Sequence, residues 1–143
     1  MQASTKSMVL DIVSAEASIF NGVVTYLSVS GGSGELGIHP GHTALLTSLK
    51  SGQVVAKFED GQEEIFYISG GMLEVQPESV TILSDTASRA EDLDEAAAIA
   101  AKEQAEKAIT DKRSELEHSK AVAELAEAVA QIRAIQSLRK KIK

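Results

Sequence analysis

The chain changes composition near residue 86, and this change most constrains how it can fold. Every glycine, proline and aromatic residue lies at or before Pro77, whereas residues 87–143 contain fifteen alanines among charged residues. Glycine and proline favour turns, while alanine is the strongest helix former. We therefore expect two unequal units in this 143-residue chain, residues 1–86 and residues 87–143.

The first unit alternates apolar and polar residues between closely spaced turns, which predicts an antiparallel β-sandwich or small barrel. Turns are expected at Asp60-Gly61, Gly70-Gly71 and Pro77-Glu78. Asp60-Gly61 is typical of a primed hairpin turn, in which both central residues have positive φ. The expected strands are residues 8–15, 24–30, 53–59, 63–69, 72–76 and 80–84.

The second unit has a spacing near 3.6 residues, which predicts two antiparallel helices. Asp92 or Asp94 can cap the first helix, and the second helix begins near Glu117. The break at residues 110–114 lacks glycine and proline, so the two helices could also form one extended rod. The facing residues are expected to be Ala97, Ala101, Ala105 and Ala108 on the first helix and Ala121, Leu125, Ala128, Ile132 and Ile135 on the second.

Charge is distributed unevenly between the two units. Residues 1–86 contain three lysines and ten acidic residues, whereas residues 87–143 contain eleven residues of each sign. An acidic body repels phosphate backbones, so we expect no nucleic-acid partner.

Cysteine and long apolar runs are both absent from the sequence. Disulfide and thiol chemistry are therefore excluded. Residues 1–8 lack the apolar core of a signal peptide, and no apolar run approaches the roughly 20 residues of a membrane helix. We expect the chain to stay in the compartment that made it and to have no membrane-spanning helix.

Two candidate ligand motifs occur before residue 43. Gly32, Gly34 and Gly37 have the G-x-G-x-x-G spacing of a dinucleotide site, but Pro40-Gly41 follows where such a site needs a helix, so we interpret the glycines as turn residues. His39 and His42 could be metal ligands or a general base, yet no third ligand accompanies them.

His118 is expected to be a solvated polar residue, and no serine lies in a nucleophile elbow. We expect no metal site and no catalytic site.

The last residues of the chain carry four cations, Arg139, Lys140, Lys141 and Lys143. One interpretation is that they stabilise the C-terminus of a helix through its dipole. The alternative is that they bind an acidic partner surface.

Five segments in order resemble the epsilon subunit of F-type ATP synthases. The longest is Gly34-Glu35-Leu36-Gly37-Ile38-His39-Pro40-Gly41-His42. The others are Val13-Ser14-Ala15-Glu16, Ser69-Gly70-Gly71-Met72-Leu73-Glu74-Val75, Asp85-Thr86-Ala87 and Asp92-Leu93-Asp94-Glu95-Ala96. The resemblance spans nearly the whole chain.

The resemblance implies a β-sandwich followed by a helical hairpin, in a non-catalytic subunit of the rotating central stalk. The sandwich would bind the gamma subunit and the ring of c subunits, with Glu35 facing the c ring and His42 near gamma. In bacterial members the hairpin can extend toward the alpha and beta subunits and block ATP hydrolysis. Arg133 and the four terminal cations would then meet an acidic motif of beta. The implied location is the cytoplasmic face of the bacterial inner membrane.

One motif of the family is incomplete in this chain. Some bacterial members bind ATP through Ile or Leu, Asp, two variable residues, Arg and Ala at the start of the first helix. Here Ala97 occupies the arginine position, and Gln104, Glu127 and Gln131 occupy the approximate places of further basic residues. No charged fork for a triphosphate remains, so we expect no ATP cofactor.

Two other interpretations of the sequence stay open. A free-standing adaptor would bind one protein through the sandwich and another through the hairpin, and it would not copurify with gamma. A small-ligand enzyme would use the loop of residues 32–42 and would lose activity when both histidines are replaced.

Overall fold

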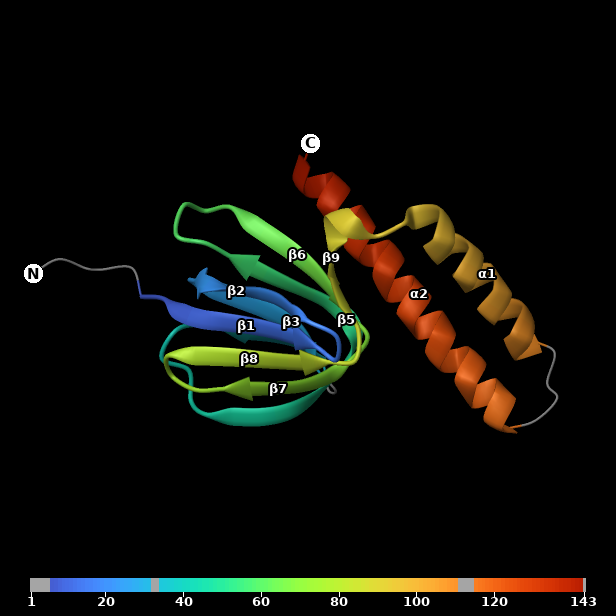
Figure 1. Cartoon of the computed structure of the whole chain (residues 1–143), viewed down its shortest axis with the longest axis horizontal. Coiled ribbons are helices and arrows are strands. Elements are labelled where there is room, and N and C mark those ends of the chain that lie inside the picture. The colour runs from blue at the N-terminus through green and yellow to red at the C-terminus, as the bar shows by residue number, and fades with distance from the viewer. Residues whose placement is uncertain (1–5, 32–33, 111–114, 143) are drawn as a thin grey trace, which may run out of the picture.

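A computed structural model describes residues 6–31, 34–110 and 115–142. The chain forms a β-sandwich followed by two antiparallel helices packed against one end of it (Figure 1). This arrangement confirms the predicted fold class. The elements are β1 (Met8–Ser14), β2 (Ser18–Val24), β3 (Tyr26–Gly31), β4 (Gly34–Ile38), β5 (Leu45–Lys57), β6 (Glu63–Ile68), β7 (Gly71–Val75), β8 (Ser79–Ser84), β9 (Ala87–Arg89), the 3₁₀ turn η1 (Ala90–Asp92), α1 (Glu95–Thr110) and α2 (Glu115–Ile142).

The strands hydrogen-bond in the order β2-β1-β8-β7-β5-β3-β4, and β6 joins β5 to β9. The 13-residue β5 links the two layers, because its first half pairs with β7 and its second half pairs with β6. All pairs are antiparallel except β1 with β8, which run parallel. The expectation of antiparallel pairing is therefore wrong for this one pair, whose strands are not joined by a hairpin.

The predicted turns are present, although one has a different geometry. The Phe58 carbonyl accepts from the Gly61 N–H at 3.0 Å, and Gly61 has φ +86°. None of the described non-glycine residues has positive φ, so Asp60 does not form the expected primed turn. The loop is instead a type I turn closed by a left-handed glycine, and the Asp60 side chain accepts from the Gln62 N–H at 2.9 Å.

The unit boundary predicted after Thr86 falls at the start of β9. Residues 87–89 pair with β6, Ala87 opposite Ile68 and Arg89 opposite Phe66. Arg89 also forms an ion pair with Glu64 of β6. These residues therefore continue the sheet before the chain enters η1 and α1.

The sandwich has its own apolar core between its two layers. The core is made by inward residues of every long strand, among them Leu10, Ile12, Leu27, Phe66 and Leu73, all fully buried. Because burial of large side chains is the main stabilising term, this unit carries most of the stability of the chain.

A second, smaller cluster joins the hairpin to the sandwich. Ile65 and Tyr67 point from the outer side of β6 toward Ala130 and Ala134 of α2, and Leu93 and Leu138 border the cluster. The continuous apolar run of β6 is explained by this contact, since the strand is covered on both faces.

The two helices meet through small residues, and one of the two predicted faces is correct. On α2, Ala121, Ala128 and Ile135 are buried and Leu125 and Ile132 are half-buried, as expected. On α1, Ala97, Ala101 and Ala108 are exposed, and Ala98 joins Ala105 as the buried pair.

α1 begins after Asp94, whose Oδ1 accepts from the Ala97 N–H at 3.2 Å. α1 ends at Thr110 and α2 begins at Glu115, so the predicted break at residues 110–114 lies largely outside the described residues.

Candidate partner-binding surfaces

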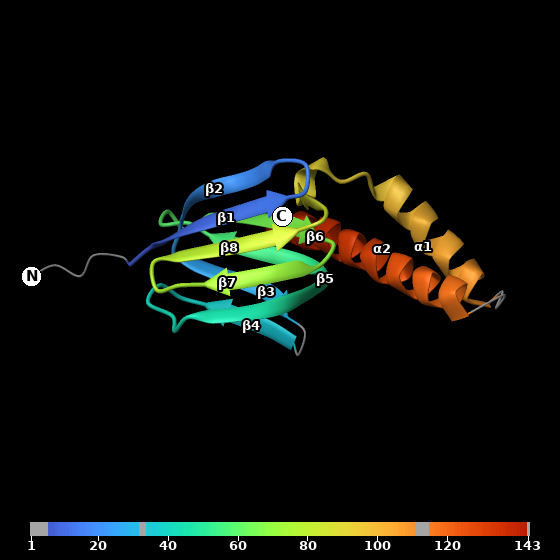
Figure 2. The same ribbon diagram turned by 60° about the horizontal axis from the view of Figure 1, so that its bottom comes forward.

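One face of the sheet is not covered by any described element. β2, β1, β8 and β7 lie side by side there, away from the hairpin (Figure 2). We call this surface the outer face and define it by Val9, Val13, Val23, Met72 and Leu83. Four of these side chains are substantially exposed: Val9 43%, Val23 51%, Met72 40% and Leu83 52%.

The outer face is organised in rows that follow the strand register. Val13 lies opposite Leu83, and Leu83 lies opposite Met72, which gives one apolar row across three strands. Val9 lies opposite Val23 at the other end of β1. A hollow of about 360 Å³ borders the first row and is lined by Val13, Ser14, Ala15, Gly71, Met72, Leu83, Ser84 and Asp85. Clustered exposed apolar side chains of this kind mark protein-binding surfaces.

A polar row with two carboxylates separates the apolar rows. Asp11 lies opposite Thr81, and Thr81 lies opposite Glu74. Leu46 of β5, which is 68% exposed, continues this row beyond Glu74. A protein that covers the outer face must therefore bring apolar groups with a cation between them.

The sequence predictions did not name the outer face. A strand with one solvated face should alternate apolar and polar residues. Two consecutive apolar residues in such a strand therefore place one apolar side chain on the outer face. Such pairs occur at Met8-Val9, Ile12-Val13, Val23-Val24, Met72-Leu73 and Ile82-Leu83.

Glu35 and His42, the two predicted partner contacts, lie at different places along β4: Glu35 is near the start of the strand, and His42 is in the loop after it. Glu35 is exposed at the start of the strand, where it pairs with Ser30. His42 follows the end of the strand, in a loop whose Gly41 N–H donates to the Pro77 carbonyl at 2.8 Å. The His42 ring donates from Nδ1 to the Thr43 carbonyl at 2.7 Å. The two side chains therefore lie apart along the direction of β4.

The glycine loop and its histidines adopt strand and turn structure. Gly34 begins β4, whereas Gly37 lies inside this strand and pairs with Ser28, so the interpretation as turn residues is wrong for Gly37. Gly32 lies outside the described residues. The His39 ring contacts Tyr26, with 4.7 Å between ring centroids. Within the described ranges, no three His, Cys, Asp or Glu side chains are grouped so that they could hold a metal ion.

His118 differs from its predicted environment. The residue is half-buried near the start of α2, and its Nδ1 is buried without a hydrogen-bond partner among the described residues. The expectation of a solvated side chain is therefore wrong.

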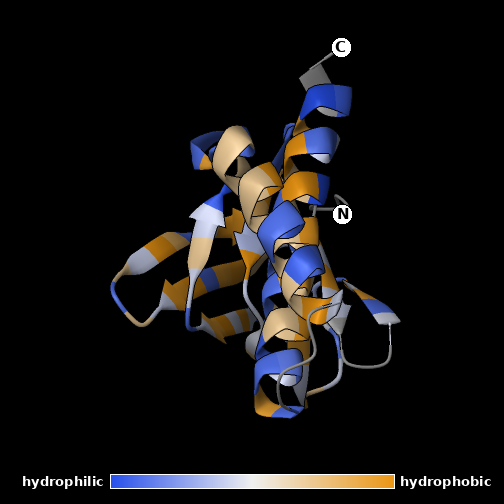
Figure 3. Cartoon of the chain, turned by 90° about the vertical axis from the view of Figure 1, so that its right-hand side faces the viewer, coloured by the Kyte–Doolittle hydropathy of each residue, from blue (hydrophilic) through white to orange (hydrophobic). Residues whose placement is uncertain are grey.

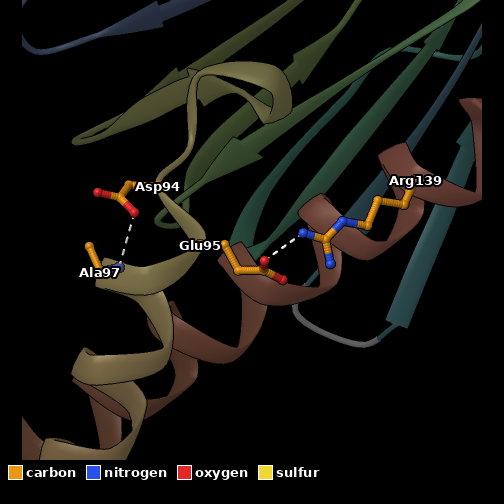
Figure 4. Close-up of polar contacts among 4 residues, drawn as sticks. All are labelled: Asp94, Glu95, Ala97 and Arg139. Carbon is orange, nitrogen blue, oxygen red and sulfur yellow. Dashed lines mark hydrogen bonds and ion pairs between the residues drawn. The ribbon is translucent and has the colours of Figure 1, made fainter.

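Four of the five predicted regulatory cations lie along the last part of α2, where hydrophilic and hydrophobic residues alternate in Figure 3. Arg133, Arg139 and Lys140 are exposed. Lys141 lies in the last turn of α2, and Lys143 lies outside the described residues. Arg139 donates to Glu95 Oε1 at 2.5 Å (Figure 4), and this hydrogen bond raises the pKa of its guanidinium.

Arg133 and Glu35 border the same cavity between α2 and the sandwich. The cavity holds about 450 Å³ and is lined by Ser30, Glu35, Ser51, Gly52, Gln53, Val122, Leu125, Ala126, Val129, Ala130 and Arg133. The hairpin therefore leaves space along part of its contact with β3 and β5. Its attachment to the sandwich is looser there than at Ile65 and Tyr67.

The four positions of the incomplete nucleotide motif are occupied by residues without a positive charge. Ala97 and Gln104 are exposed on α1. Glu127 and Gln131 lie near Tyr67, whose pKa is raised to about 12 by burial and by the Glu127 carboxylate, although its hydrogen bond with Gln131 opposes the shift. A carboxylate at this place repels phosphate.

None of the helices in the described ranges is both long and apolar enough to cross a membrane.

The fold defines a class of two-part proteins, in which a β-sandwich with an uncovered apolar face precedes a helical hairpin. Residues 7–90 match the family described as ATP synthase, Delta/Epsilon chain, beta-sandwich domain. Residues 91–136 match the long alpha-helix domain of the same chain. The chain belongs to this family, and its bacterial relatives are ATP synthase epsilon chains.

Two of these relatives cover nearly the whole chain. The ATP synthase epsilon chain of Nitrosococcus oceani is 55% identical over 95% of this chain and 97% of its own length. That of Legionella pneumophila (strain Corby) is 59% identical over 94% of this chain and 96% of its own length.

A solved structure has the same fold at low sequence identity. It is a chain of the Euglena gracilis mitochondrial ATP synthase, from a structure of OSCP, F1 and the c-ring in rotational state 1. The two chains superpose with a TM-score of 0.81 at 21% identity, over 90% of this chain and 81% of the other.

Proposed function

We propose that this chain is a rotor component of a bacterial proton-translocating ATP synthase. It couples rotation of the c ring to the catalytic alpha and beta subunits through gamma, and it performs no covalent chemistry itself. The observation that carries the proposal is the uncovered outer face, in a chain that matches bacterial epsilon chains along nearly its full length.

In this proposal the outer face binds gamma. The apolar row of Val13, Leu83 and Met72 supplies buried contact area, and Asp11 and Glu74 require a cation from gamma. His42 contacts gamma beyond the end of β4, and Glu35, near the start of β4, faces the polar loops of the c ring. The subunit thereby lies on the cytoplasmic face of the inner membrane, bound through the complex.

The hairpin is proposed to be a mobile arm that inhibits ATP hydrolysis. Its contacts with the sandwich are mainly those of Ala130 and Ala134 on Ile65 and Tyr67, beside a cavity of about 450 Å³. The 28 residues of α2 span about 42 Å at 1.5 Å per residue, which is long enough to reach from the stalk into the catalytic head. Arg133, Arg139, Lys140, Lys141 and Lys143 then meet carboxylates of the beta subunit.

Copurification tests the assignment to the complex. The full-length chain with an affinity tag, expressed in its bacterial host, should bring down gamma together with the alpha, beta and c subunits. Recovery of other proteins without gamma would instead identify a free-standing adaptor.

Calorimetry tests the proposed absence of ATP binding. Titration of the isolated chain with millimolar MgATP should give little or no heat beyond dilution, because Ala97 replaces the motif arginine and Glu127 adds a negative charge near Tyr67. A clear affinity below 1 mM would contradict the proposal and would mean that other residues form the site.

A further inference from the structure

Glu95 and Arg139 connect the two ends of the helical hairpin. Glu95 lies in the first turn of α1, and Arg139 lies near the end of α2, 44 residues later. The two side chains form a hydrogen-bonded ion pair with an N–O distance of 2.5 Å (Figure 4). The pair therefore exists only while the end of α2 lies beside the start of α1.

The local structure leaves Glu95 free to make this contact. The neighbouring carboxylate, Asp94, already caps α1 by accepting from the Ala97 N–H. Because the helices are antiparallel, the positive end of the α1 dipole and the negative end of the α2 dipole lie near each other. A carboxylate on α1 and a cation on α2 are each favoured at these ends.

The remaining contacts of the hairpin are modest, which makes the ion pair significant. The buried residues of α1 are Ala98 and Ala105, and alanines bury little apolar area. Leu93 and Leu138 lie at the border of the cluster that joins α2 to the sandwich, one or two residues from the paired side chains. An added attraction at this point opposes separation of the last turns of α2 from the sandwich.

We propose that Glu95 regulates the arm by competing with the catalytic head for Arg139. The inference rests on the proposed function, in which Arg139 meets carboxylates of the beta subunit when the hairpin extends. One guanidinium cannot be close to Glu95 and to the head at the same time, so each contact weakens the other. Glu95 is thus a positioning residue that favours the folded hairpin, and its removal should favour extension.

The folded fraction can be measured directly on the full-length chain. The chain has no cysteine, so spin labels on cysteines introduced at Glu78 and Gln136, both exposed, report the distance between sandwich and α2 unambiguously. The E95Q substitution should raise the ratio of open to folded molecules roughly 1.4- to fivefold, the range for an exposed ion pair. The difference should shrink in 1 M salt, which screens exposed charges.

The matched control is E103Q, which removes another exposed carboxylate from α1. It should leave the distance distribution unchanged. The charge swap E95R/R139E restores an ion pair of opposite orientation. Its folded fraction should therefore be higher than the sum of the effects of E95R and R139E predicts. Equal distributions for E95Q and the unsubstituted chain, or an additive charge swap, would overturn the proposal.

Hydrolysis by the assembled complex separates this inference from the proposed function. If both hold, E95Q lowers ATP hydrolysis, whereas removal of the hairpin raises it. If the label distances change but removal of the hairpin leaves hydrolysis unaltered, the ion pair stands and the inhibitory function is rejected.

Discussion

Replacing Met72 and Leu83 by glutamate should weaken the binding of this chain to gamma by about 100-fold or more, since an unpaired charge in an interface costs several kcal/mol. The two residues lie opposite each other on β7 and β8, in the apolar row of the outer face. Both are partly exposed in the isolated chain, so the substitutions should leave its own core intact. The affinity is measured by titrating the variant into complex depleted of this subunit.

The control is I99E, which adds one glutamate, half the charge added by M72E/L83E, to a residue of the arm. Ile99 lies on α1 and is 42% exposed, close to the 40% of Met72. This variant should bind as the unsubstituted chain does, because α1 lies away from the outer face. If M72E/L83E keeps its affinity while its circular dichroism is native, gamma binds elsewhere.

The sequence predicted the sandwich well where a strand is rich in apolar residues and a short turn joins it to a neighbour close in the chain. Residues 63–69 and 72–76 were expected as strands and correspond to β6 and β7. β2 was missed because Asn21 and Gly22 interrupt its apolar residues. The first half of β5 was missed because Thr47, Ser48 and Lys50 make it polar, and its pairing with β7 stabilises it.

The parallel pair of β1 and β8 has no local signal at all. Val9 pairs with Ser79, and Ser14 pairs with Ser84, across 70 residues of chain. Periodicity describes which side of a strand is buried, but it does not identify the neighbour. The outer face depends on this pair, since Val13 meets Leu83 across it, so the site could not be assembled from sequence.

The buried face of the helical arm was predicted correctly for α2 but not for α1. On α2, Leu125, Ile132 and Ile135 mark the inward side by their size, and the prediction was correct. On α1, residues 96–98 and 100–101 are all alanine, so several faces are equally apolar and the spacing did not discriminate among them. The contact between Glu95 and Arg139 was missed because it depends on how the two helices are placed along each other. The sequence of one helix alone does not determine which turn of the other helix lies beside it.

Removing the hairpin should raise ATP hydrolysis by the purified complex while leaving the rotor assembled. The deletion is best made after Leu93, because β9 and η1 belong to the sandwich. The folded and extended states are expected to differ by little in free energy. If the extended state is favoured by about 1 kcal/mol, about 85% of complexes are blocked, and removal of the arm raises the rate about sixfold.

A tethered hairpin tests the same prediction without exposing Ile65 and Tyr67, which α2 covers. Cysteines replacing Glu95 and Arg139 can be joined by a cleavable thiol-reactive linker, since the chain has no other cysteine. Linking them should raise hydrolysis as the deletion does, and cleaving the linker should restore inhibition. The uncleaved and cleaved samples differ only in the tether and are therefore matched.

Charge reversal at the end of the arm should reproduce part of the effect of the deletion. Glutamates at Arg139, Lys140, Lys141 and Lys143 remove attraction to the acidic head, although each exposed pair contributes only about 0.2 to 1 kcal/mol. Replacing Arg139 also breaks the pair with Glu95, which favours opening and partly offsets the loss. Reversal of the three lysines alone keeps the pair between Glu95 and Arg139, so its relief of inhibition should not be offset in this way. If the truncated and the tethered complexes both hydrolyse ATP at the rate of the inhibited intact enzyme, the arm does not inhibit this ATP synthase.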